Sequence, residues 1–223
     1  MSVPPAFAQT LQGNILSRAN LLLFVREFLR ECQVEPGAYV EFGVLNGESI
    51  RQSYAILRGS IARFIGYDTF DGIPELSLLD QHCKALHPRF TEENFRSAGI
   101  DVVRRYLESS GIPAGQLKLV PGDIRAIGQC DFEQHLGGSG PRATVVHIDV
   151  DLHSSTLAAL ELVVPHAIDG SWFLFDDYWC YRGSPACGVQ RALSEFTVTH
   201  PTASFTPYAN YNGWGRVFIF HNL

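Results

Sequence analysis

Two short apolar runs each end in a pair of acids: Val145-Val146-His147-Ile148-Asp149-Val150-Asp151 and Trp172-Phe173-Leu174-Phe175-Asp176-Asp177. Apolar runs of this length, bounded by polar residues, are typical of buried strands in a parallel sheet. Four acids at the ends of two such strands would repel one another unless a positive group lies between them. We therefore predict a divalent metal ion at the carboxyl edge of an α/β sheet, where open sheets usually bind their ligands.

The rest of the chain alternates between strand and helix patterns. Further strands are expected at 38–44, 63–68, 116–121 and 214–220, and helices at 15–32, 47–57, 91–109, 154–167 and 189–199. This alternation predicts βαβ units and a doubly wound, mostly parallel sheet in a single domain, 1–223. Residues 1–35 are its leading helical segment. The connection at 71–90 is longer than a βα unit needs, which predicts a lid after the second strand.

Composition excludes several classes of function. The 223 residues carry a net charge of -6 and no basic face, which argues against a nucleic-acid partner. No apolar run approaches the roughly 20 residues of a membrane span, and the amino terminus lacks a secretory signal pattern. Five cysteines, an odd number without C-x-x-C spacing, argue against a disulfide framework and for a reducing compartment. We therefore expect a cytoplasmic protein with no membrane partner.

The first three strands each end in residues suited to a ligand. Glu41-Phe42-Gly43-Val44-Leu45-Asn46-Gly47 places two glycines before a helix, so backbone N–H groups can approach a ligand there. The phosphate-binding patterns G-x-G-x-x-G and G-K-[ST] are absent, and the acid before the loop suits a ligand with an amino group and a positive centre. Asp68 ends the second strand, where an acid commonly holds the hydroxyls of a ribose. Gly122-Asp123 ends the third and can meet an adenine edge.

Asp149, Asp176 and Asp177 are the expected metal ligands. In a doubly wound sheet of this type the fourth strand lies between the first and the fifth, and neighbouring strands are about 4.8 Å apart. These carboxylates can reach a common point, and oxygen-rich sites of this kind select hard cations such as Mg²⁺. Asp151 points to the same face as Asp149 if the strand stays extended. It could instead cap the helix that begins near Ser154.

The histidines and one serine near these motifs carry weaker signals. His147 lies inside an apolar strand and is expected to be a hydrogen-bonded core residue. His82 and His87 are expected to be ordinary loop residues of the lid, whereas His153 is a candidate for substrate contact. Ser49 is expected to cap the helix after the glycine loop.

Together these motifs resemble the macrocin O-methyltransferase family, class I S-adenosylmethionine-dependent methyltransferases of antibiotic-sugar biosynthesis. The matching residues, within roughly 36–196, are Glu41-x-Gly43-Val44-x-x-Gly47, Asp68-Thr69-Phe70-Asp71-Gly72-Ile73-Pro74-Glu75, Asp149-x-Asp151-Leu152-x-Ser154-x-Thr156 and Asp176-Asp177-Tyr178. Two positions depart from the family pattern. Leu45-Asn46-Gly47-Glu48 stands where relatives tend to have Trp-Arg-Gly-Gly, and Val150 stands where they tend to have glycine.

The resemblance implies a seven-stranded Rossmann-like sheet and a set of site residues. It implies Mg²⁺ on Asp149, Asp176 and Asp177, with Asp151 as the candidate general base and Asp149 as the second catalytic residue. It also implies a segment after Glu75 that closes over the site. With their neighbours included, the residues expected to hold S-adenosylmethionine are Glu41, Gly43, Gly47, Ser49, Asp68, Thr69, Phe70, Gly122, Asp123 and Asp149.

The expected activity is a Mg²⁺-assisted O-methylation of a small-molecule hydroxyl or diol, with a sugar hydroxyl of a glycosylated natural product as the implied acceptor. A catechol-like phenol would satisfy the same metal geometry. A metal-dependent glycosyltransferase also uses Asp-x-Asp, but it has no need for an acid before the glycine loop. A non-catalytic scaffold of this fold has no reason to keep four crowded carboxylates. The amphipathic helix at 15–32 could be a core element or the interface of a homo-oligomer.

Overall fold

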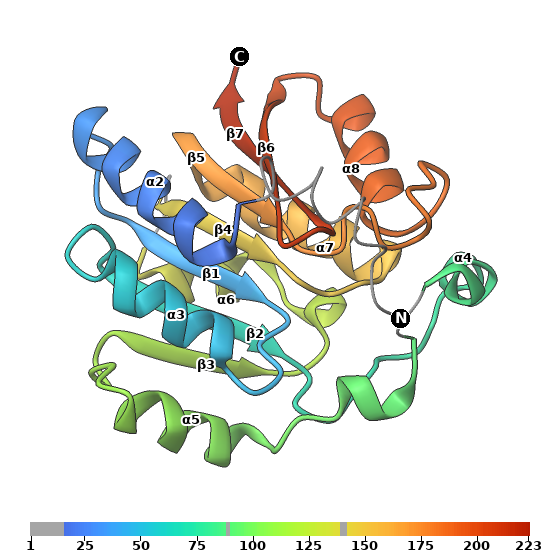
Figure 1. The fold of residues 1–223 in the computed structure, drawn as a ribbon, viewed down its shortest axis with the longest axis horizontal. Coiled ribbons are helices and arrows are strands. Elements are labelled where there is room, and N and C mark those ends of the chain that lie inside the picture. Colours follow the sequence, from blue (N-terminus) through green and yellow to red (C-terminus); the bar gives the residue numbers. More distant parts are fainter. Residues whose placement is uncertain (1–15, 88–89, 139–141) are drawn as a thin grey trace, which may run out of the picture.

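The computed structural model describes residues 16–87, 90–138 and 142–223, which form one central sheet with helices on both faces (Figure 1). The strands are β1 Ala38–Phe42, β2 Arg63–Asp68, β3 Leu117–Pro121, β4 Ala143–Ile148, β5 Ala167–Phe175, β6 Ala203–Tyr211 and β7 Gly215–Asn222. Their order is β3-β2-β1-β4-β5-β7-β6, and only the pairings of β7 are antiparallel within the described chain. The predicted doubly wound, seven-stranded sheet is confirmed.

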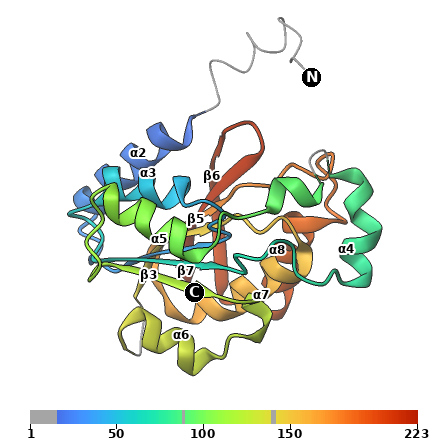
Figure 2. The same ribbon diagram turned by 90° about the horizontal axis from the view of Figure 1, so that it is seen from below.

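The helices divide between the two faces of the sheet, as Figure 2 shows for α2 and α3 against α6. The α-helices are α2 Arg18–Glu31, α3 Glu48–Leu57, α4 Leu78–Cys83, α5 Ile100–Ser109, α6 Gln129–Leu136, α7 His153–Val163 and α8 Gly188–Thr199. Short 3-10 helices are η1 Lys84–Leu86, η2 Glu92–Phe95, η3 Ile124–Ala126 and η4 Val164–His166. Helix α4 lies at the edge toward which the parallel strands point (Figure 1).

Two apolar cores, one on each face, explain why the strands read as continuous apolar runs. Val145 and Trp172 pack with α2, α3 and α5, whereas their neighbours Val146 and Phe173 pack with α6, α7 and α8. Successive side chains of a strand point to opposite faces, so a sheet covered on both faces needs apolar residues at every position. The leading helix α2 contributes Leu21, Leu22, Val25 and Leu29 to the first core. It is therefore a core element of this chain.

The register of the sheet positions the site. Phe42 of β1 pairs with Ile148 of β4, and Ile148 pairs with Phe175 of β5. The next residues, Gly43, Asp149 and Asp176, therefore leave the sheet side by side. The backbone N–H of Asp149 donates to the Phe42 carbonyl at 2.8 Å, and that of Asp176 donates to the Ile148 carbonyl at 3.1 Å. The predicted convergence of strand ends is confirmed.

One strand was not expected, and two local expectations are wrong. Strand β6 has no predicted counterpart, because most of its side chains are exposed or half-buried and show no apolar alternation. The helix expected at 91–109 is interrupted at Gly99, whose φ of +91° is unsuited to a helix, and only η2 and α5 form. The cap expected from Ser49 is absent: α3 begins after Gly47 in the left-handed region, and Ser49 is buried.

The prediction against a disulfide is also wrong. Cys83, at the end of α4, is bonded to Cys187, which precedes α8, across a sequence separation of 104 residues. Residue spacing could not reveal this pair, because it depends on where the long connection after β2 lies. The other cysteines, Cys32, Cys130 and Cys180, are free. No helix in the described ranges is long and apolar enough to cross a membrane.

The disulfide makes a prediction for thiol chemistry. Protein purified without reductant should expose three thiols to Ellman's reagent after denaturation and five after reduction. Replacing Cys83 and Cys187 by serine should lower the free energy of unfolding by about 2–4 kcal/mol, since the crosslink restricts the unfolded chain. Serine at the exposed Cys32 and Cys130 is the control and should change little. Five reactive thiols before reduction would contradict the pairing.

Candidate active site

A cavity of about 390 Å³ lies at the carboxyl edge of the sheet. Loops after β1 to β5, the lid residues Ile73, Pro74 and Phe90, and Phe95 of η2 line it. Most of the predicted site residues contribute to this lining, namely Gly43, Asp68, Thr69, Gly122, Asp123, Asp149, Asp151, Asp176 and Asp177. The structure therefore brings the expected cofactor acids and the expected metal acids to one chamber.

Four nominated residues do not line the cavity: Glu41, Gly47, Ser49 and Phe70. Glu41 is fully buried, and its carboxylate accepts hydrogen bonds from the hydroxyls of Tyr39 and Ser49. Gly47 packs against α5, where an added Cβ would meet Leu107 at 3.1 Å. Glu41 and Ser49 are thus buried away from the cavity, and Gly47 faces α5. A direct contact between these three residues and a cofactor stays a prediction.

Gly43 allows the loops after β1 and β4 to touch. Its φ is +91°, and a Cβ built on it would lie 1.8 Å from the carbonyl oxygen of Asp149. Only glycine fits such a close approach of two backbones. The first glycine of the loop is therefore required by packing against the strand end that carries Asp149.

Asp68 ties the first two loops together. Its carboxylate accepts the backbone N–H of Leu45 at 2.8 Å and that of Phe70 at 2.6 Å. Asp123 is held differently, since it caps η3 and its carboxylate pairs with Arg125. The Arg125 guanidinium lowers the pKa of Asp123. Both predicted cofactor acids are therefore held by hydrogen bonds and lie within the lining of the cavity.

Asp149, Asp176 and Asp177 form an acid cluster, in which burial opposes the ionisation of Asp176 but the neighbouring His147 lowers its pKa. Removal from water raises the pKa of Asp149, and repulsion from Asp176 and Asp177 raises it further. Burial and repulsion from Asp151 and Asp176 likewise raise the pKa of Asp177. Oδ1 of Asp176 is buried and makes no hydrogen bond, and the nearby positive group is His147, whose Nε2 lies 3.6 Å away. Hard, crowded carboxylate oxygens fit a divalent cation such as Mg²⁺.

The three carboxylates share an edge but do not form a closed ligand set in this structure. Among the described residues, the set of three possible metal ligands whose donor atoms lie within 4.8 Å of one another is His87, Asp177 and Cys180. The thiol of Cys180 donates to Asp177 Oδ1 at 2.8 Å. Burial and the neighbouring carboxylates raise the pKa of this thiol, which keeps it protonated.

His147 differs from its prediction as a hydrogen-bonded core histidine. Neither ring nitrogen makes a hydrogen bond, but Nδ1 lies 3.3 Å from Glu41 Oε2 and Nε2 lies 3.6 Å from Asp176 Oδ1. Burial alone would lower the pKa of His147, yet the Asp176 and Glu41 carboxylates raise it to about 9. Glu41 and His147 are register partners on adjacent strands. That pairing is the signal that sequence reasoning overlooked.

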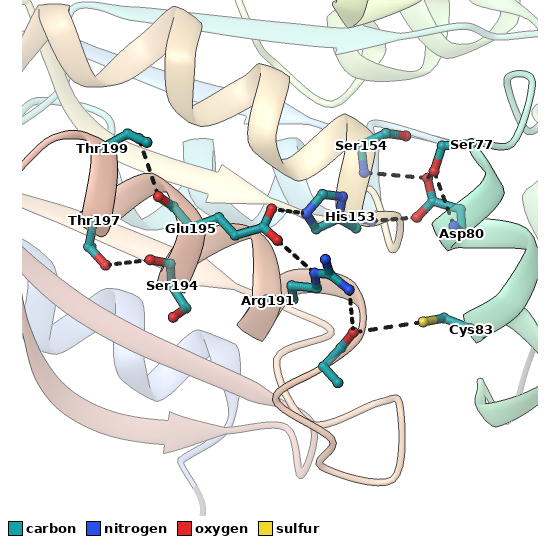
Figure 3. A network of polar contacts seen from close by, with 11 residues as sticks. Ser77, Asp80, Cys83, His153, Ser154, Arg191, Ser194, Glu195, Thr197 and Thr199 are labelled. Carbon is teal, nitrogen blue, oxygen red and sulfur yellow. Dashed lines mark hydrogen bonds and ion pairs between the residues drawn. The ribbon is translucent and has the colours of Figure 1, made fainter.

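Asp151 does not cap α7, and β4 ends at Ile148 rather than extending to it. Its φ of +56° turns the chain immediately after the strand. The first N–H groups of α7 instead meet Asp80 of the lid, with His153 N–H donating to Oδ1 at 2.8 Å and Ser154 N–H approaching Oδ2 at 3.4 Å (Figure 3). The alternative role of Asp151 as a cap of this helix is therefore wrong. Asp80 binds the start of α7 instead, and the sequence analysis missed it.

The histidines of the lid region fall into different environments. His82 is exposed, as expected for a residue with no role in the site. His87 is buried, and its Nε2 lies 2.7 Å from Asp151 Oδ1, so its prediction as an ordinary loop residue is wrong. His153 does not line the cavity. Its Nε2 lies 2.6 Å from Glu195, which also pairs with Arg191 on α8 (Figure 3).

Comparison with known proteins gives a consistent result. The family model for Macrocin-O-methyltransferase (TylF) matches residues 4–204. The 8-demethyl-8-(2,3-dimethoxy-alpha-L-rhamnosyl)-tetracenomycin-C 4'-O-methyltransferase of Streptomyces olivaceus is 32% identical over 179 residues. That alignment covers 78% of this chain and 64% of the relative, so the chain spans just under two thirds of its length.

Solved structures share the fold at low sequence identity. The O-methyltransferase NovP has a TM-score of 0.70 at 21% identity, over 92% of this chain and 79% of that one. The calicheamicin methyltransferase CalS11 has a TM-score of 0.64 at 21% identity, over 97% of this chain and 86% of that one. A Bacillus cereus O-methyltransferase in complex with SAH has a TM-score of 0.54 at 16% identity, over 96% of this chain and 86% of that one. These likenesses show that the fold is that of class I O-methyltransferases.

Proposed function

Because this chain belongs to the macrocin-O-methyltransferase family, we propose that it transfers the methyl group of S-adenosylmethionine to a hydroxyl of a sugar on a glycosylated natural product. One observation carries the proposal: residues suited to a nucleoside and residues suited to a hard cation line the same cavity. The Streptomyces olivaceus relative is named for a rhamnosyl 4'-hydroxyl, which makes deoxysugar glycosides the first acceptors to try. The family match across residues 4–204 leaves a glycosyltransferase or a scaffold without support.

The cofactor would lie across the loops after β1, β2 and β3. Asp68 would accept hydrogen bonds from the ribose hydroxyls, as acids at this place in doubly wound folds do. The Gly122–Asp123 turn would face the adenine, and the backbone around Gly43 would face the methionine portion. Support comes from their shared cavity and from the hydrogen bonds that fix Asp68.

Asp149, Asp176 and Asp177 would hold Mg²⁺. Their crowded carboxylates support this assignment, because burial and mutual repulsion raise the pKa of Asp149 and Asp177. A cation bound there would supply Lewis acidity that lowers the pKa of an acceptor hydroxyl. His147 Nε2 lies 3.6 Å from Asp176 Oδ1 and so limits where that carboxylate can turn.

Asp151 would take the proton of the acceptor hydroxyl. S-adenosylmethionine would supply the methyl group to the freed oxygen: the C–O bond would form as the S–C bond breaks, and S-adenosylhomocysteine would be released. No covalent enzyme intermediate is needed, so orientation supplies much of the acceleration. The apolar lid residues Pro74 and Phe90, with Phe95 of η2, border the cavity and would keep water from the sulfonium.

The test is transfer of labelled methyl from S-adenosylmethionine to a panel of deoxysugar glycosides, with catechols as a second panel. We expect labelled glycosides, and we expect a chelator to abolish the transfer. Labelled catechols with unlabelled glycosides would move the acceptor to phenols. No transfer to either panel by protein that binds S-adenosylhomocysteine would contradict the proposed acceptor classes.

Mg²⁺ binding should depend on pH with a definite sign. The raised pKa values of Asp149 and Asp177 mean that these two carboxyls hold more protons in the folded chain than in the unfolded one. The contribution of these two carboxyls to stability therefore falls as pH rises above the ordinary aspartate pKa. Mg²⁺ must displace those protons, so it should raise Tm more at about pH 8 than at about pH 6.

Calorimetry checks the same point without an acceptor. Titration of Mg²⁺ in two buffers of different ionisation enthalpy should reveal proton release from the wild-type protein. Asp177→Asn should reduce both the proton release and the shift in Tm. Equal shifts in Tm at both pH values, with no proton release, would count against the metal site.

Three further expectations stay predictions: a single domain over residues 1–223, a homo-oligomer and a cytoplasmic location. The disulfide removes the cysteine argument for the last of these.

A further inference from the structure

His87 reaches the expected general base from the lid. Its side chain is only 3% exposed, and Nε2 lies 2.7 Å from Asp151 Oδ1, although the two residues are 64 positions apart. The distance is that of a direct hydrogen bond. The buried His87 imidazole thus connects the lid to Asp151, which follows β4 at the carboxyl edge of the sheet.

Tyr181 fixes both members of this pair. Its ring packs edge-on against His87, with centroids 5.1 Å apart and an interplanar angle of 72°. Its hydroxyl donates to the backbone carbonyl of Asp151 at 3.1 Å. Asp151 also has a positive φ of 56°, a conformation that persists only when its surroundings hold it. Its side chain is thus held from the lid and its backbone from the loop before α8.

The lid itself is anchored at two further points. Asp80 of α4 receives the first N–H groups of α7, and Cys83 is bonded to Cys187 before α8. Figure 3 shows Asp80 and Cys83 on α4, with Asp80 facing the start of α7. These anchors set the position of η1 and therefore of His87, which follows it directly.

We propose that His87 is a positioning residue: its Nε2–H donates to Asp151 and orients that carboxylate toward the acceptor hydroxyl. The inference rests on the proposed methyl transfer, in which Asp151 takes the proton. A neutral imidazole is sufficient, since it needs one ring N–H as donor. Docking of the lid and alignment of the base are then one event, so the base is aligned only when the cavity is covered.

The mutational test compares His87→Leu with His87→Gln, because glutamine keeps an N–H donor and leucine does not. His87→Leu should lower kcat by about 10–100-fold, as loss of a supporting hydrogen bond does. It should leave the acceptor KM and the Kd for S-adenosylhomocysteine nearly unchanged, and His87→Gln should recover most of kcat. His82→Leu, on the exposed face of the same lid, is the matched control and should behave as wild type.

Two results would overturn the inference. Equal loss in the leucine and glutamine variants, with raised KM, would indicate that His87 only packs the lid. A loss of Mg²⁺ or Zn²⁺ affinity in both variants would make His87 a metal ligand with Asp177 and Cys180, whose donor atoms lie within 4.8 Å of it.

A spectroscopic measurement keeps this inference separate from the proposed function. In ¹⁵N-histidine NMR spectra, His87 should be an Nε2–H tautomer with a slowly exchanging ring proton that disappears in Asp151→Ala. If the wild type fails to bind S-adenosylhomocysteine, the proposed function fails whatever the signal. If it binds and the ring proton of His87 exchanges fast in wild type, only the role of His87 fails.

Discussion

Replacing Asp176 or Asp177 by asparagine is expected to lower kcat for methyl transfer by roughly 10²–10³-fold, because each change removes an anionic ligand of the cation that would stabilise the developing alkoxide. Asparagine keeps the shape of the side chain, so the fold should be unaffected. The Kd for S-adenosylhomocysteine should stay within about threefold of wild type, because these residues would stabilise the transition state and would not bind the cofactor. The expected cofactor contacts come from the loops after β1 to β3.

Steady-state kinetics and calorimetry with S-adenosylhomocysteine measure the two effects separately. Asp101→Asn is the matched control, since Asp101 is exposed in the first turn of α5. It should leave both quantities unchanged. The assignment would be contradicted by the reverse pattern, in which the asparagine variants lose cofactor affinity yet turn over normally at saturation.

Gly43→Ala is expected to have the second large effect. The new Cβ would lie 1.8 Å from the carbonyl oxygen of Asp149, so the loops after β1 and β4 must separate. A displacement on the order of 1 Å at a binding loop can lower a rate about 100-fold, because the bound groups are no longer aligned. We therefore expect about that loss of affinity for S-adenosylhomocysteine, together with a fall in the free energy of unfolding.

The chain offers a close control for backbone strain. Gly111 has a φ of +94°, against +91° for Gly43, but an added Cβ would meet nothing within 4 Å. Gly111→Ala should therefore cost only the left-handed conformation, about 1–2 kcal/mol, and leave the cofactor affinity intact. Thermal unfolding and calorimetry of both variants separate strain from collision. Equal affinities in the two variants would show that the contact between Gly43 and Asp149 does not shape the cofactor site.

Much of the fold follows from local pattern. The apolar run at 144–149 requires a strand covered on both faces, and with βα alternation the order of the parallel strands follows. The register then brings Asp149 and Asp176 to one edge without further information. Strand β6 could not be predicted in this way, because most of its side chains are exposed or half-buried and show no apolar pattern. Its extended conformation depends on backbone pairing with β7.

The parts of the site that sequence could not predict all depend on the lid. Asp80 caps α7, Cys83 bonds Cys187 and His87 meets Asp151, across 64 to 104 positions. No periodicity marks residues 71–90, so nothing local indicates which side chains return to the sheet. His147 is a different case. It reads as a core residue because its strand is apolar, and its charge follows only from the carboxylates on either side of it.

The central claim is that carboxylates from adjacent strand ends hold a divalent cation beside a sulfonium donor. Crystals grown with S-adenosylhomocysteine and Mn²⁺, a scatterer that substitutes for Mg²⁺, test it most directly. The account predicts an anomalous peak coordinated by Asp149, Asp176 and Asp177, with the ribose of the bound molecule on Asp68. A peak on His87 and Cys180 instead, or no peak beside well-ordered S-adenosylhomocysteine, would contradict it.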